Sequence, residues 1–466
     1  MLMAPISITF RRTMNFKRAS LIIQSIGLIA LTWKPGLPLA TETVPPAPDS
    51  THNQTDWYMA GGLFEMLPDG GPNAASWMKH YQLTLGGWVD AGLTYNPSNP
   101  GDGFNGTVTF GDRDRELQLN QTYLFIERAI DAESDNWDLG GRVDFLYGTD
   151  AVFSQANGNP SGHWDKHLLG NHNRFYQLAI PQVYLEIKTP VGSGLRTKIG
   201  HFYTTIGNES VMAPDNFFYS HTYLMQYGEP FTQTGLLTSY SFMDNLTFSV
   251  GAVTGSLTGG WDGVFDKNLN QWGFLGGVTW ADETTSLTAN ANHGTQASNS
   301  GDWNIYSLVL HHDIIDSLHF TLQHDYGWAD KAVNNQGAQW YGIVPYLVYD
   351  IEEKLSVGLR AEWFRDNQGF RALSRTRISN NPAAGGNGHL APLPSLSPQG
   401  NLTGNTYYEV TLGLNWKPQS WIIVRPNVRY DWADNTRMFD CASNNSPSAC
   451  QGNNQWLMST DVILTF

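Results

Sequence analysis

Long apolar runs are almost absent from this chain of 466 residues. Beyond residue 31, no stretch of about eighteen consecutive apolar residues occurs, which argues against a transmembrane helix there. Charged residues make up only 15% of the chain, and its 27 basic residues are outnumbered by 42 acidic ones. The net charge of −15 argues against a nucleic-acid partner, because phosphate groups require a basic binding face.

Cysteine is also scarce, and its two copies, Cys441 and Cys450, lie close together in a polar stretch. Neither has a second cysteine or a histidine at the spacing of a zinc site. In an exported protein, two such neighbours are expected to form a local disulfide. The histidines and the Asp and Asn residues of 262–270 match no metal-binding motif, so no metal ion or cofactor is predicted, although calcium binding by external loops stays open.

Glycine and aromatic residues are abundant instead, with 47 Gly, 17 Trp, 20 Tyr and 22 Phe. The chain ends in QWLMSTDVILTF, where apolar and polar residues alternate as in a strand with one apolar face. Phe466, Leu464 and Val462 lie on that face. A terminal Phe on such a strand resembles the C-terminal insertion signal of bacterial outer-membrane β-barrels, which makes the barrel assembly machinery an expected partner. The last strand of a soluble β-sandwich would show the same alternation.

The same alternation recurs along the chain in about sixteen segments of roughly ten residues. Short, turn-like connections and long connections alternate between these segments. A soluble sandwich has no reason for this alternation, whereas an outer-membrane barrel has short periplasmic turns and long external loops. The chain is therefore predicted to be all-β, with a transmembrane antiparallel up-and-down barrel over residues 81–466. The predicted strands are 81–95, 117–131, 137–148, 174–188, 195–205, 234–242, 246–257, 271–281, 285–293, 303–312, 317–328, 340–350, 354–365, 406–417, 421–432 and 455–466.

Charged residues fall on the face of these strands that is predicted to line a wet lumen. The basic ones could form a cationic wall that sets ion preference. Alternatively, they pair with acidic neighbours on the same face, and we expect pairing for more than half of them. The basic residues concerned are Arg142, Arg196, Lys198, Arg360, Arg425 and Arg429, and the acidic neighbours are Asp138, Asp144, Glu362 and Asp431.

The N-terminal 80 residues are predicted to lie outside the barrel. Residues 1–40 have the pattern of a secretory signal peptide, with basic residues before the short apolar run LIIQSIGLIAL. Cleavage is expected after Ala40, and Met14 is an alternative start of the chain. Residues 41–80 are rich in proline and glycine and are expected to be a periplasmic lead, or else a plug that folds into the barrel.

Two stretches resemble outer-membrane β-barrel porins of the porin-2 type, a family of diderm bacteria. They are LNQTYLFIERAID, residues 119–131, and IGHFYTTIGNESVMAPDNFFYSHTY, residues 199–223. The resemblance extends over about residues 118–466 and leaves out the N-terminal lead and the cysteine-containing loop. It implies a multi-pass barrel in the bilayer of the outer membrane that lets small hydrophilic solutes or ions diffuse passively, but it does not identify the solute.

The third long connection, residues 206–233, is predicted to narrow the pore. In general diffusion porins the third long loop folds into the lumen, so this expectation comes from the resemblance. Seven aromatic or large aliphatic residues between positions 217 and 227 also make it too apolar for a free external loop. Glu209, Asp215 and Glu229 would then stand across a narrow gap from the inward-facing arginines and create a transverse field. Alternatively, the aromatic residues pack loop on loop at a trimer contact.

Two other classes of protein compete with a porin. A structural or adhesive surface barrel would favour about eight strands, because sixteen strands leave an aqueous channel. A barrel enzyme is disfavoured, since the sequence has no GxSxG motif and no convincing Ser, His and Asp set. No catalytic residue is therefore predicted. By analogy with other sixteen-stranded porins, a homotrimer is expected.

Overall fold

The computed structural model describes residues 62–67, 71–101, 103–132, 134–156, 164–165, 168–169, 176–254, 272–295, 301–333, 336–369, 371–372, 404–434, 437–441 and 450–466. The chain divides into two compact units, residues 1–44 and 45–466, and every described residue belongs to the second. The expected signal peptide and residues 41–61 of the expected lead lie outside the described residues. No helix in the described ranges is both long and apolar enough to span a membrane.

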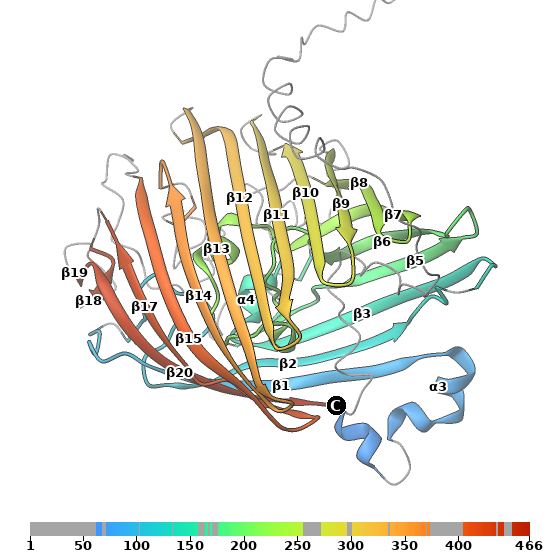
Figure 1. The fold of residues 1–466 in the computed structure, drawn as a ribbon, viewed down its shortest axis with the longest axis horizontal. Helices are drawn as coiled ribbons and strands as arrows, with labels where there is room; N and C mark the ends of the chain where they lie inside the picture. The colour runs from blue at the N-terminus through green and yellow to red at the C-terminus, as the bar shows by residue number, and fades with distance from the viewer. Residues whose placement is uncertain are drawn as a thin grey trace, which may run out of the picture. The chain divides into compact units, whose positions relative to one another are not determined.

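The strands form a closed antiparallel barrel of sixteen spans, as the sequence predicted (Figure 1). Each span pairs with its neighbours in the chain, and the last span pairs with the first to close the ring. The closure reaches the final residue, because Gly87 and Phe466 exchange two backbone hydrogen bonds of 3.0 and 2.9 Å. The strands of the ring are β1 (Thr84–Tyr95), β2 (Leu117–Arg128), β3 (Asp138–Gly148), β4 (Gln177–Ala179), β5 (Val183–Thr189), β6 (Leu195–Tyr203), β7 (Thr232–Met243), β8 (Leu246–Thr254), β9 (Trp272–Ala281), β10 (Thr285–Thr295), β11 (Asp302–Ile315), β12 (Leu318–Val333), β13 (Gln336–Glu352), β14 (Leu355–Asp366), β15 (Asn405–Gln419), β16 (Ile422–Val424), β17 (Asn427–Ala433) and β20 (Asn454–Thr465).

Two of the sixteen spans are interrupted at a proline. Pro181 separates β4 from β5, and Pro426 separates β16 from β17. Proline has no N–H to donate to the ladder, so pairing stops locally. The two halves of each span stay in the same ring. Both β4 and β5 pair with β3, and β5 also pairs with β6, whereas β16 and β17 both pair with β15 and β20.

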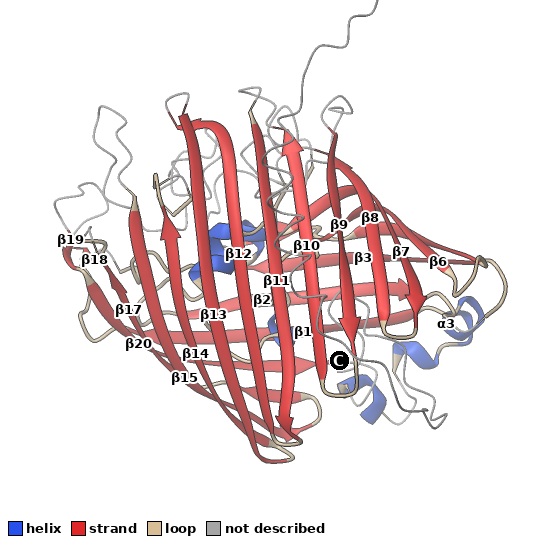
Figure 2. Cartoon of the chain, turned by 45° about the horizontal axis from the view of Figure 1, so that its top comes forward, coloured by secondary structure: helices blue, strands red, loops and turns tan. Residues whose placement is uncertain are grey.

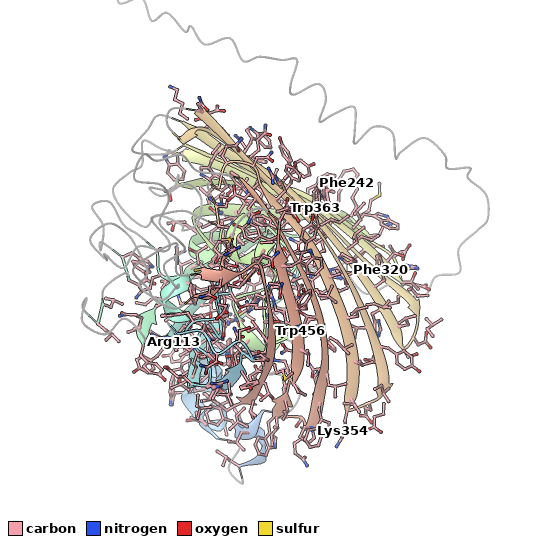
Figure 3. The ribbon with its side chains drawn as sticks, turned by 90° about the vertical axis from the view of Figure 1, so that its left-hand side faces the viewer. Arg113, Phe242, Phe320, Lys354, Trp363 and Trp456 are labelled. Carbon is pink, nitrogen blue, oxygen red and sulfur yellow. The ribbon has the colours of Figure 1, made fainter. Side chains whose placement is uncertain are left out.

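Alternation along the strands separates an apolar outer face from a polar inner face. Leu359 and Trp363 of β14 are 44% and 38% exposed, whereas Arg360 between them is fully buried inside. Figure 3 shows Trp363, Phe320 and Trp456 on the outer side of the ribbon. Leu464 and Val462 of the last strand also face outward, about 40% exposed. In an outer membrane this outer face contacts lipid.

The short turns lie where the sequence predicted them, but one predicted long connection is wrong. Residues 329–339 are mostly strand, because β12 continues to Val333 and β13 already begins at Gln336. A strand that extends beyond the membrane needs no apolar face, so its polar residues have the composition of a loop. A separate hairpin, β18 (Phe439–Cys441) and β19 (Cys450–Gly452), lies in the last long connection.

The described N-terminal segment lies against the periplasmic end of the first and last strands (Figure 1). The Phe64 ring packs edge-on against the Phe466 ring, with centroids 5.1 Å apart. The Asn73 side chain exchanges hydrogen bonds of 2.9 and 2.8 Å with the backbone of Leu85. Its helical turns are η1 (Leu63–Met66), η2 (Pro72–Ala74) and α3 (Ser76–Tyr81).

Candidate functional site

Residues 204–231, which connect β6 to β7, pack against inward-facing side chains of the barrel. Figure 2 shows helical turns within the ring of strands, and two such turns belong to this segment, η3 (Ala213–Asp215) and η4 (Leu224–Gly228). Apart from Phe217, which is partly exposed, its large apolar side chains are at most 4% exposed. The buried residues are Phe218, Tyr219, Tyr223, Leu224, Met225 and Tyr227.

Glycines on the inner face of the wall make room for these aromatic rings. A Cβ atom added at Gly358 of β14 would lie 2.4 Å from the Phe217 ring. A Cβ atom at Gly92 of β1 would lie 2.5 Å from the Tyr219 ring. The rings therefore occupy the space that the side chain of any residue other than glycine would fill at these two positions.

The Arg360 guanidinium joins the segment to the wall. Its Nε atom is 2.6 Å from Glu409 Oε1 on β15, and its Nη1 atom is 2.7 Å from Glu209 Oε1 in the segment. Nη1 also donates to the carbonyl of Ser220 at 2.7 Å. A planar guanidinium can serve several acceptors at once, so one buried side chain fixes three groups.

Two further arginines, Arg425 and Arg429, hold the same segment by its backbone carbonyls. Each arginine is buried and uses part of its guanidinium to pair with an aspartate of the wall. Other N–H groups of the same guanidinium donate to backbone carbonyls of the segment. Arg425 pairs with Asp461 and donates to the carbonyls of Ala213 and Asn216 at 2.7 and 2.8 Å. Arg429 pairs with Asp431 at 2.7 Å and donates to the carbonyl of His221.

A carboxylate of the wall, unlike the arginines, binds the segment as a hydrogen-bond acceptor. The two oxygens of Glu362 accept hydrogen bonds from the backbone N–H groups of Tyr223 and Leu224, both at 2.6 Å. These N–H groups lie at the start of η4, where a helical turn leaves its donors unpaired. At the end of η4, Trp340 Nε1 donates to the carbonyl of the last residue at 2.9 Å.

The first long connection, residues 96–116, packs against residues 204–231. The backbone N–H of Thr109 donates to the side chain of Gln226. Gly106, with φ of +67°, lies so close to the β18–β19 hairpin that a Cβ atom there would be 2.7 Å from the Phe439 ring. The hairpin thus contacts the first connection, which in turn contacts the inner segment.

The three acidic residues predicted to face the arginines across a gap are in different environments. Glu209 is in direct contact with Arg360, so the predicted gap between these two residues is absent. Burying two unpaired charges would cost several kcal/mol per ion, which favours contact over separation. Glu229 is buried and accepts a hydrogen bond of 2.6 Å from Gln323 Nε2 on β12. Asp215 is partly exposed at the end of η3.

Burial and pairing act against each other on the Glu209 carboxyl group. Burial alone would raise its pKa, but Arg360 and His221 lower the pKa of Glu209 to about 2. The His221 Nδ1 atom is 3.1 Å from Glu209 Oε2, and the backbone N–H of Thr222 donates to the same oxygen at 3.0 Å. Glu209 is therefore a carboxylate at neutral pH and a fixed part of the arginine contacts.

The six basic residues predicted to face inward divide into two groups. Arg142, like the three arginines above, is buried and paired, with its Nε atom 2.7 Å from Asp144 Oδ1. These four are thus both buried and in contact with a carboxylate. Arg196 and Lys198 of β6 are partly exposed, and the strand register places Lys198 opposite the buried Glu186 of β5.

Sequence reasoning missed the wall partners of two arginines, Glu409 for Arg360 and Asp461 for Arg425. Pairs two residues apart on one strand, such as Arg142 with Asp144, share a face and can be found from the sequence. Glu409 and Asp461 lie on other strands, so finding them requires the register between strands.

Solved outer-membrane porins share this fold, and two of them are compared with this chain. An anion-selective porin from Comamonas acidovorans is 9% identical, with a TM-score of 0.50 over 82% of this chain and 99% of that chain. OprB of Pseudomonas putida is 13% identical, with a TM-score of 0.50 over 85% of this chain and 97% of that chain. At these identities the likeness concerns the fold alone.

Among curated proteins, none matches this chain. Residues 82–466 match the family described as "Putative beta-barrel porin-2, OmpL-like". That match includes every strand of the barrel and both stretches that suggested the family from the sequence. The chain therefore belongs to this family of outer-membrane β-barrel porins.

Proposed function

We propose that the protein forms a water-filled channel for the passive diffusion of small hydrophilic solutes or ions, and that residues 204–231 narrow it. The carrying observation is the attachment of this segment to the inner wall by Arg360, Arg425, Arg429 and Glu362. Barrels of sixteen strands are wide enough for an aqueous channel. A segment attached to the inner wall of such a barrel reduces the open cross-section of the channel and leaves part of it open.

Single-channel recording in planar bilayers tests this function. Discrete open steps are expected for the purified protein. Silence together with hydrolysis of lipid or peptide would point to a barrel enzyme, and silence without any hydrolysis would point to a structural or adhesive barrel. Either form of silence would contradict the proposed channel.

We also propose that the barrel assembles as a homotrimer in the outer membrane. This proposal comes from the analogy with other sixteen-stranded porins and concerns the outer apolar face. Native mass spectrometry in mild detergent should detect a species of three chains. A spectrum that contains only single chains would end the trimer proposal and leave the channel proposal intact.

A disulfide between Cys441 and Cys450 is expected to staple the β18–β19 hairpin. The register places the two residues directly opposite each other, and opposed residues of an antiparallel pair have Cα distances within the range of a disulfide. Because the closed loop is short, the bond should stabilise the protein by at most about 3 kcal/mol. Quantitative thiol labelling of the unreduced, unfolded protein should find no free thiol, whereas two labelled thiols per chain would refute the bond.

A further inference from the structure

Two buried carboxyl groups contact each other where the inner segment leaves η4. Glu229 is the first residue after η4, Asp325 lies on the inner face of β12, and both are at most 1% exposed. Gln323 Nε2 donates to both groups, to Glu229 Oε1 at 2.6 Å and to Asp325 Oδ2 at 3.1 Å. The two carboxyl groups are also hydrogen-bonded to each other. Because two carboxylates offer no donor, this acid pair of Glu229 and Asp325 is bonded directly only while it holds a proton.

The surrounding groups fix the positions of both carboxyl groups. Gln323 Oε1 accepts from the backbone N–H of Asn208 at 3.3 Å, which turns Nε2 toward the acid pair. Gly207 has a φ of +92°, and a Cβ atom there would overlap with Glu229 Oε2. Only glycine therefore leaves room for the Glu229 carboxyl group at this point of the segment. Ser307 on β11 accepts from the N–H of Gly207 at 3.3 Å and so holds this turn on the wall.

No cation neutralises the acid pair in the part of the chain that the structure describes. None of the described Lys and Arg side chains forms an ion pair with either carboxyl group. Glu209, a second buried acid of the segment, differs because Arg360 contacts it. Burial raises the pKa of Glu229 well above its usual value, and Asp325 raises it further. Glu229 therefore stays protonated at pH values at which an ordinary glutamate has ionised, and it donates to Asp325.

Other titratable groups lie near the acid pair without neutralising it. Glu209 acts on the pair as a further negative charge, and Tyr346 of β13 donates to Glu209 at 3.0 Å. His324 acts on the pair from the neighbouring position of β12. Arg371 donates to the carbonyl of Tyr227, two residues before the end of the segment that carries the pair, at 2.6 Å. The charge of the pair therefore depends mainly on its own proton.

We propose that the acid pair is a proton-dependent contact that holds the end of the inner segment on β12, and that losing its proton at alkaline pH releases this end and raises the conductance. Two adjacent carboxylates repel each other strongly where little water screens them. The arginine contacts hold residues 209–221 and keep the rest of the segment in place. Release therefore widens the channel beside β12 without removing the segment. This inference rests on the proposed channel function.

Single-channel conductance, corrected for the conductivity of the solution, tests the acid pair between about pH 6 and about pH 10. For the unaltered protein it should rise roughly 1.5-fold over this range, because the freed end no longer narrows the channel. E229Q and D325N should each abolish the rise, since an amide donates to the remaining carboxylate at every pH. E352Q is the matched control, because Glu352 is an exposed acid at the end of β13, and this variant should keep the rise.

The pH dependence of stability provides a second measurement that does not require an open channel. Because the folded pKa of Glu229 is raised above its usual value of 4.5, its stabilising contribution is complete below pH 4.5 and is lost as the pH rises through the folded pKa. E229Q should therefore lose less stability than the unaltered protein as the pH becomes alkaline. Denaturant-induced unfolding in detergent micelles measures the difference.

The possible outcomes separate this inference from the channel itself. A conductance of the unaltered protein that does not change with pH would overturn the role of the acid pair and leave the channel standing. So would a rise that persists in both E229Q and D325N, or one that E352Q also abolishes. A rise caused by removing calcium ions at constant pH would mean that the pair holds a cation, and would also overturn the proposal. If the unaltered protein never opens, the proposed function fails, and the stability measurement still decides whether the pair holds a proton.

Discussion

Replacing Arg360 by alanine should lower the free energy of unfolding by about 3–5 kcal/mol, since it removes one partner of a buried ionic network. Glu209 and Glu409 would then lie close together without the cation between them. The repulsion between the two carboxylates, together with the uncompensated cost of keeping them away from water, should release the inner segment from the wall. Denaturant-induced unfolding in detergent micelles, followed by tryptophan fluorescence, measures the change.

The matched control is the neighbouring arginine on the other face of the same strand. Arg365 is only partly buried and donates to neutral groups, Asn367 at 2.8 Å and Thr406 at 3.1 Å. Arg365→Ala should therefore cost far less, within about 1 kcal/mol for a site away from buried networks. A similar loss for both variants would contradict the role of Arg360.

The effect of Arg360→Ala should also depend on pH. Because the folded pKa of Glu209 is lowered from 4.5 to about 2, its ionic contact stabilises the protein fully above pH 4.5. This stabilisation is lost as the pH falls toward 2. The difference in stability between the two proteins should therefore narrow below pH 4.5, and Arg360→Lys, which keeps the charge, should retain part of that pH dependence.

Deleting residues 211–227 and joining the ends with a short glycine and serine linker should raise the single-channel conductance roughly two-fold or more, because the narrowest part limits ion flow. The deletion removes the segment that Arg425 and Arg429 hold, but both arginines keep their aspartate partners on the wall. None of the sixteen spans is shortened. The barrel should therefore still form.

Tyr223→Phe is the appropriate control for this deletion. It removes only the hydroxyl group that donates to Asp431 at 2.7 Å, so the segment keeps its arginine contacts and the conductance should stay near that of the unaltered protein. Circular dichroism should give the same β content for all three proteins. An unchanged conductance of a correctly folded deletion variant would place the narrowest point elsewhere.

The barrel could be predicted from the sequence because each span carries its own signal. In β14, for example, Leu359 and Trp363 flank Arg360 and Glu362 with the period of two that a strand between lipid and lumen requires. The two proline-broken spans were still recognisable, because the alternation resumes on the same face after Pro426. The strand residues within 329–339 were missed, because the strands there extend beyond the membrane and need no apolar face. The β18–β19 hairpin was missed as well.

The interior was harder to predict than the wall. The sequence indicated that residues 206–233 are too apolar to stay outside, which agrees with their burial. The sequence also predicted that Glu209 faces the inward-facing arginines, but across a gap, whereas in the structure Glu209 is in contact with Arg360. Contact distances depend on how far a segment reaches into the barrel, and that is set by the space left at glycines such as Gly92 and Gly358 on distant strands.

The bond between the first and last strands has a consequence for biogenesis. Gly87 and Phe466 are separated by nearly the whole barrel in sequence, so the ring closes through the contact of longest sequence separation that the barrel makes. Such contacts form late in folding, because closing a long loop costs conformational entropy. Before closure, both terminal strands have an edge of unpaired backbone groups. Until β20 pairs with β1, the sheet therefore keeps two open edges that can pair with another chain, so closure of the ring also protects the protein from aggregation.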